Sequence, residues 1–98
     1  MKNKIKQLLE IEQQLIHLEA RKAYYIDIRH FMNAYSLDNA TLNLVKREHG
    51  NIVDYKSIND FDVFVGVKTF IRDNMNEKIQ ECNNEINELN QKLKEFNL

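Results

Sequence analysis

The chain contains no proline and no tryptophan, one cysteine and only two glycines among its 98 residues. Because proline and glycine most often interrupt regular structure, their near absence favours long helices. The single cysteine, Cys82, excludes an intrachain disulfide and is typical of a reducing compartment. No apolar run is long enough to span a membrane, and the N-terminal MKNKIKQLLEIEQQ becomes charged again before a signal-peptide core forms. We therefore expect a cytoplasmic protein without a membrane segment.

Neither sign of charge predominates, because the chain has 14 Lys and Arg and 15 Asp and Glu, a formal net charge of −1. Duplex nucleic acid is therefore not an expected partner, because its binding requires a basic surface. The length predicts one domain over residues 1–98. A compact domain of this size buries only about 60–65% of its unfolded surface. Two long helices bury less, so we expect a homo-oligomer, a dimer or higher, or a complex with another protein.

Residues 3–35 are predicted to form one long helix. Their apolar side chains recur at spacings of three, four and seven, at Ile5, Leu8, Leu9, Ile11, Leu15, Ile16, Leu18, Ala23, Ile26 and Phe31. The apolar stripe is wide, because a second seven-residue row beginning at Ile11 runs beside Leu8 and Leu15. A stripe of this width can contact two neighbours at once.

Residues 59–97 are predicted to form the second long helix, with a coiled-coil pattern over 79–96. Six residues alternate in steps of three and four, which is an a/d pattern: Ile79, Cys82, Ile86, Leu89, Leu93 and Phe96. We expect these residues to form an oligomer seam. Its antiparallel partner is either the first helix of the same chain or a helix of a second chain.

The beginning of the second helix has two interpretations. Asn59, Asp60 or Asp62 is a candidate N-cap for a helix. The segment FDVFVGVKTF, residues 61–70, also alternates like a strand. We favour the helix, because the apolar pattern continues without interruption to Phe96.

The head between the helices, about 36–58, also has two interpretations. One is a short helix over about 39–49, capped by Ser36 or Asp38, with Gly50 just beyond its C-terminus. The other is a β-hairpin that turns at His49-Gly50-Asn51. We slightly favour the helix. The expected fold is mostly α, with two long helices packed as an antiparallel hairpin and a small head at about 36–62.

No group of residues predicts catalysis, a cofactor or a metal. His17, His30 and His49 are far apart in sequence, and the Asp27/His30 pair has no matching pair elsewhere. The place of Cys82 in the seam predicts a buried apolar residue rather than a nucleophile. A glycine-rich phosphate loop, a Cys-x-x-Cys motif and a nucleophile elbow are all missing from the sequence.

Basic and aromatic residues concentrate between positions 21 and 56. This segment holds six Lys and Arg against four Asp and Glu, whereas residues 57–98 hold five against eight. Three side chains lie one helical turn apart and two more lie in the head: Arg21, Tyr25, Arg29, Lys46 and Arg47. They are a candidate surface for a partner protein or an anion. The alternative is a solvated edge of the core.

The sequence thus predicts a non-enzymatic helical interaction module, a small oligomeric regulator, inhibitor or adaptor. The alternative is an oligomer that binds a nucleotide-like or other anionic ligand through the Arg and Tyr residues. The Asn-, Lys- and Ile-rich composition is typical of AT-rich coding DNA. This bias extends the expectation to a phage or mobile-element protein that acts on a host or defence protein.

Overall fold

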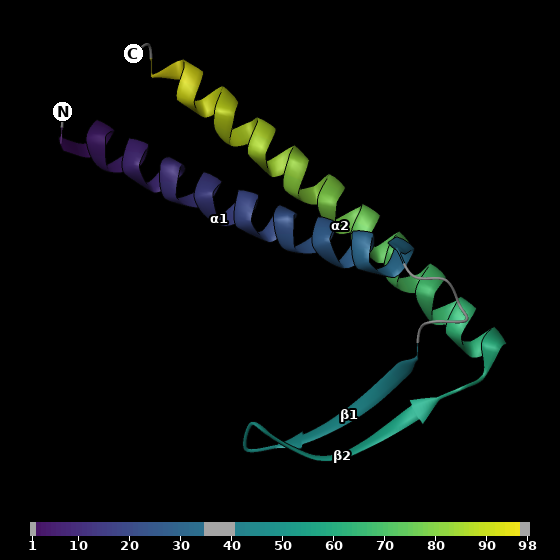
Figure 1. The fold of residues 1–98 in the computed structure, drawn as a ribbon. Helices are drawn as coiled ribbons and strands as arrows, with labels where there is room; N and C mark the ends of the chain where they lie inside the picture. Colours follow the sequence, from purple (N-terminus) through teal and green to yellow (C-terminus); the bar gives the residue numbers. More distant parts are fainter. Residues whose placement is uncertain (1, 35–40, 97–98) are drawn as a thin grey trace.

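The computed structural model describes residues 2–34 and 41–96 and contains two helices and two strands. Their order is α1 (Lys2–Ala34), β1 (Leu42–Glu48), β2 (Asn51–Ile58) and α2 (Phe61–Glu95). Helices α1 and α2 form an antiparallel helical hairpin, and the two strands project from its closed end (Figure 1). The predicted mostly helical fold with a small head is confirmed. In the part of the chain that the structure describes, neither helix is long and apolar enough to cross a membrane.

The molecule is elongated. It measures 60 × 31 × 16 Å, with a radius of gyration of 19.5 Å. A compact domain of this length has a radius of gyration of about 13 Å. The chain therefore has too little thickness to bury more than one face of each helix.

Helix α1 agrees with the predicted span of 3–35, of which residue 35 lies outside the described residues. Helix α2 begins two residues later than the predicted span of 59–97 and ends at Glu95, and residue 97 lies outside the described residues. The N-cap is Asp60, whose carboxylate accepts a hydrogen bond from the Val63 N–H at 3.0 Å. Residues 61–70 are therefore helical, and their strand-like alternation does not produce a strand.

The core lies along the interface of the two helices. Ile11 and Leu18 of α1 form one buried cluster with Cys82, Ile86 and Leu89 of α2. Partly buried side chains extend this cluster toward both ends: Leu15, Tyr25, Leu93 and Phe96. Ile79 is also buried. The seam of α2 thus packs on α1 of its own chain, the first of the two partners that the pattern left open.

The head is a β-hairpin, so the favoured short helix over 39–49 is wrong; residues 36–40 lie outside the described residues. Strands β1 and β2 pair antiparallel, with Leu42 opposite Ile58 and Glu48 opposite Asn51. Backbone φ is 51° at His49 and 82° at Gly50. Positive φ at both central residues is the geometry of a type I′ turn, which matches the twist of the flanking strands. A glycine at position 50 is compatible with a helix C-terminus and with a type I′ turn, because both require positive φ there.

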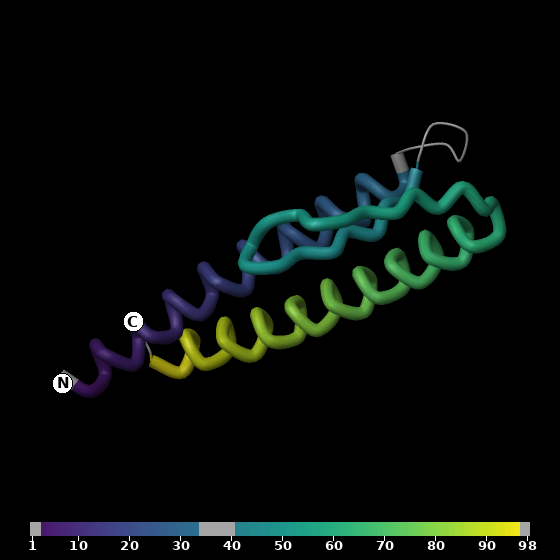
Figure 2. Tube along the Cα trace, turned by 90° about the horizontal axis from the view of Figure 1, so that it is seen from below, coloured from purple at the N-terminus to yellow at the C-terminus, as the bar shows by residue number. Residues whose placement is uncertain are grey.

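The hairpin is not packed on the helices. The extensive contacts within the chain are those between α1 and α2 and those between β1 and β2. Figure 1 shows the strands diverging from the helices, and Figure 2, seen from below, shows them passing beneath the second half of α1. The helical hairpin and the β-hairpin therefore share few contacts.

The seam should carry most of the stability of the helical hairpin. Leu89→Ala removes a buried side chain from the central cluster, which we expect to lower the free energy of unfolding by about 2–3 kcal/mol. The matched control is Phe70→Ala, because Phe70 lies on the same helix but is 68% exposed. That variant should change stability by less than about 0.5 kcal/mol. Urea unfolding followed by circular dichroism measures both, and equal losses would contradict the assigned core.

The β-hairpin should unfold without the helices. Gly50→Ala places a Cβ at φ 82°, which costs about 1 kcal/mol and should lower the hairpin population. His49→Asn, at φ 51°, should retain the hairpin because Asn tolerates positive φ. Hα chemical shifts of Val45 and Tyr55 report the hairpin, and circular dichroism at 222 nm reports the helices. A loss of helical signal in Gly50→Ala would show that the two parts fold as one unit.

Candidate interaction surfaces

The β-hairpin presents apolar side chains that nothing in the described chain covers. Leu44 is 59% exposed and Tyr55 is 67% exposed. Val45, Ile52 and Val53 are exposed as well. A two-stranded hairpin is at best marginally stable alone in water. We define these five residues as the hairpin patch.

Both faces of the hairpin contribute to this exposure. Successive strand residues point to opposite faces, so Leu44 and Val45 lie on different sides. Val45 is opposite Tyr55 in the ladder. Beside that pair, the Ser57 hydroxyl donates a hydrogen bond to the side-chain Oδ1 of Asn43 at 2.7 Å, which reinforces the pairing of the two strands. Among residues 2–34 and 41–96, no second layer packs on either face.

The charge of the hairpin is slightly positive. Lys46 lies opposite Asp54 in the ladder. The remaining charges are those of Arg47, Lys56 and Glu48, all exposed. The hairpin therefore combines apolar and aromatic side chains with an excess of one positive charge, a composition that suits a protein surface with acidic residues around an apolar centre.

The hairpin patch was not among the surfaces predicted from the sequence. Its signals were present, because residues 42–45 and 52–55 are rich in branched and aromatic residues around the His49-Gly50 turn. They were outweighed by the basic residues before Gly50, which also suit the C-terminus of a helix.

Helix α1 has a second uncovered apolar surface on the side away from the seam. Five exposed residues form it, and we define them as the outer row: Ile5, Leu9, Ile16, Ala20 and Tyr24. Helical residues advance by about 100° each, so Leu9 and the buried Leu18, nine positions apart, point in opposite directions. Ile16, at the middle of the row, is 70% exposed. The wide stripe of α1 thus has one side buried on α2 and the other side uncovered.

The structure separates the five residues of the predicted partner or anion surface. Arg21 is exposed on α1. Tyr25, one turn later, is partly buried and packs against the core cluster. Lys46 and Arg47 lie on β1, where consecutive side chains point to opposite faces. The hairpin has no extensive packing against α1, so these residues do not form one surface.

Arg29 has a structural role between the helices. Its Nη1 donates a hydrogen bond to the Oδ1 of Asn76 on α2 at 2.9 Å. The side chain is partly buried and joins α1 to α2 beyond the apolar cluster. Tyr25 packs against the core and Arg29 is hydrogen-bonded to Asn76, so Arg21 is the one member of the helical row in the exposed class. This favours the interpretation of the row as an edge of the core.

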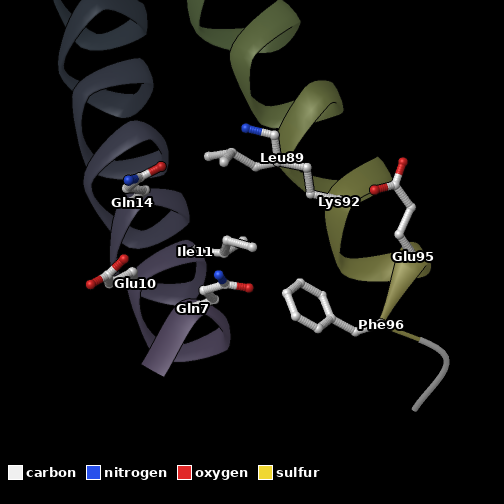
Figure 3. Close-up of a pocket in the computed structure, with 8 residues that line it drawn as sticks. All are labelled: Gln7, Glu10, Ile11, Gln14, Leu89, Lys92, Glu95 and Phe96. Carbon is white, nitrogen blue, oxygen red and sulfur yellow. The ribbon is translucent and has the colours of Figure 1, made fainter. Parts of the chain in front are cut away.

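A groove of about 380 Å³ lies where α1 and α2 diverge toward the chain ends. Figure 3 shows Ile11, Leu89 and the Phe96 ring directed into it between the two helices. Its rim is polar: Gln7, Glu10, Gln14, Lys92 and Glu95. The groove thus lies at the edge of the seam, where charged side chains of both signs surround an apolar floor. It contains no histidine or cysteine.

The titratable residues are dispersed. Cys82 is a free thiol with 4% of its surface exposed in the middle of the seam. His17, His30 and His49 are all exposed. Within the described ranges 2–34 and 41–96, no three His, Cys, Asp or Glu side chains are grouped so that they could hold a metal ion. Among the described residues, the hairpin patch and the outer row are two exposed apolar surfaces available for recognition.

Comparisons with known proteins add no relative to this description. No family model, curated protein or solved structure matches the chain.

Proposed function

We propose that the chain is a non-enzymatic protein-interaction module, a small regulator, inhibitor or adaptor whose β-hairpin contacts another protein. The helical hairpin is the scaffold, and the hairpin patch is the contact element. The observation that carries this proposal is the exposure of Leu44, Val45, Ile52, Val53 and Tyr55 on a two-stranded sheet without a covering layer. Apolar side chains of this kind gain free energy, about 25 cal/mol per Å², when a partner removes them from water.

The total surface area supports a binding function. The chain exposes 8176 Å², whereas a compact monomer of 11.7 kDa exposes about 5,900 Å². The excess of about 2,300 Å² is larger than the 1,200–2,000 Å² that a standard protein–protein interface buries in total. The elongated chain therefore exposes more surface than its mass requires, and a standard interface would take about 800 Å² of it.

The scaffold gives the hairpin a defined starting point. Only Asn59 and Asp60 separate Ile58, the last residue of β2, from Phe61, the first residue of α2. Asp60 is held by its capping hydrogen bond, and Ile58 is partly buried. A connection this short restricts the directions in which the hairpin can point.

Two modes of recognition suit the hairpin. Both outer strand edges carry backbone groups that do not pair within this sheet of two strands, so an extended segment of a partner can add a strand. The side chains of Val45 and Tyr55 can at the same time fill apolar pockets of that partner. We propose that the target is a cytoplasmic protein, since the free, buried Cys82 suits a reducing compartment. The AT-rich composition extends the proposal to a phage or mobile element and a host target.

Site-specific photo-cross-linking tests the proposal. A benzoylphenylalanine at position 55, in cells of the natural source, should yield a covalent adduct with one partner protein. The same group at the exposed position 91 on α2 should yield none. The double variant Val45→Thr with Ile52→Thr keeps branched strand formers but removes apolar surface, and should weaken binding to the captured protein at least tenfold. Circular dichroism should remain unchanged.

Three results would contradict the proposal. One is an equal adduct yield from positions 55 and 91, and another is the complete absence of a protein adduct at position 55. The third is an adduct of twice the chain mass alone, because the hairpin would then contact only a second copy of the chain.

A further inference from the structure

We infer that a second copy of the chain covers the outer row of α1, with the two α1 helices antiparallel, so that the dimer has four helices side by side in the order α2, α1, α1, α2. This inference uses a different surface from the hairpin patch and does not rest on the proposed function. The outer row and two charged residues near its ends, Lys6 and Asp27, carry this inference.

The outer row has the length and composition of a helix–helix interface. Ile5 and Tyr24 are 19 positions apart, which corresponds to about 29 Å of helix. Ala20 and Ala23 lie toward the Tyr24 end of this span, and small side chains there permit close approach of a second helix. The row lies opposite the seam, so a helix packed on it meets α1 alone and leaves α2 in place.

Asp27 identifies the kind of partner. Asp27 lies on the same face of α1 as Leu9, because 18 residues correspond to five full helical turns. It is the next residue on this face after Tyr24. Within the described residues, neither Asp27 nor Lys6 forms an ion pair. A helix that covers the row must therefore bring a positive charge to Asp27, because a covered and unpaired carboxylate is strongly unfavourable.

A second copy supplies that charge only in the antiparallel orientation. If the two-fold axis passes between positions 16 and 17, residue n faces residue 33 − n of the second copy. Leu9 then faces Tyr24, and Lys6 faces Asp27, each twice by symmetry. The two Ile16 side chains meet beside the axis. In a parallel pair, by contrast, Asp27 would face Asp27 with no cation opposite it.

The area available fits this assignment. The excess exposed surface of about 2,300 Å² per chain is larger than a standard interface needs from both partners together. A dimer through α1 can therefore leave the hairpin patch uncovered for a different partner.

Sedimentation equilibrium on the full chain tests the dimer. The wild-type chain should sediment as a dimer. Ile16→Asp should sediment as a monomer with unchanged helicity, because Ile16 contributes nothing to the buried core. Phe70→Asp is the matched control, since Phe70 is equally exposed but lies on α2, and it should remain dimeric.

A charge exchange tests the orientation. Lys6→Asp and Asp27→Lys should each raise the dissociation constant about tenfold, because each creates two like-charge contacts across the axis. The double variant Lys6→Asp with Asp27→Lys should restore the wild-type value. Ile16→Cys should form a disulfide-linked dimer on mild oxidation, whereas the wild-type chain, whose Cys82 is buried, should not.

A monomeric wild-type chain, or a dimer that survives Ile16→Asp, would overturn the inference. A double variant as weak as either single variant would overturn the antiparallel register. None of these results depends on whether the hairpin captures another protein, so the two proposals fail separately.

Discussion

The packing of the α2 seam on α1 is the interaction on which the rest of the structure depends. It joins residues as distant in sequence as Leu18 and Ile86 and thereby brings the two ends of a long chain together. The hydrogen bond from Arg29 to Asn76 extends the same interface toward the closed end. Because the seam is continuous, the β-hairpin must leave the molecule at that closed end, where Asp60 begins α2 (Figure 1).

This arrangement has an unavoidable consequence for the remaining apolar residues. Two helices can bury one face each against the other, and α1 carries apolar side chains on two opposite faces. A two-stranded sheet cannot bury either of its own faces without a third element. The outer row and the hairpin patch therefore stay exposed within the described chain. The proposed dimer and the proposed partner each account for one of these two surfaces.

The two helices and the seam could be predicted from the sequence because both depend on the spacing of apolar residues along the chain. Steps of three and four residues identify Cys82, Ile86 and Leu89 as buried without knowledge of the partner. The same steps could not tell an intrachain from an interchain partner, since a heptad pattern is identical in both. The groove beside Phe96 was not predicted either, because it depends on how far the two helices diverge.

The head was interpreted wrongly for a physical reason. Gly50 suits both a helix C-terminus and a type I′ turn, and basic residues before it suit either structure. The deciding contacts, such as Val45 with Tyr55, join positions ten residues apart and are invisible to a local pattern. The hairpin patch was missed for the same reason, because its exposure depends on which other elements fail to pack against the strands.

Amide hydrogen exchange of the purified chain tests the central claim most directly, namely that the hairpin is uncovered within its own chain. Amides around Leu18 and Ile86 should exchange most slowly, because they open only when the helical hairpin unfolds. Amides of residues 42–58 should exchange at least a hundredfold faster. Equal protection of the strands and the seam would contradict the account, because the hairpin would then be packed against the scaffold.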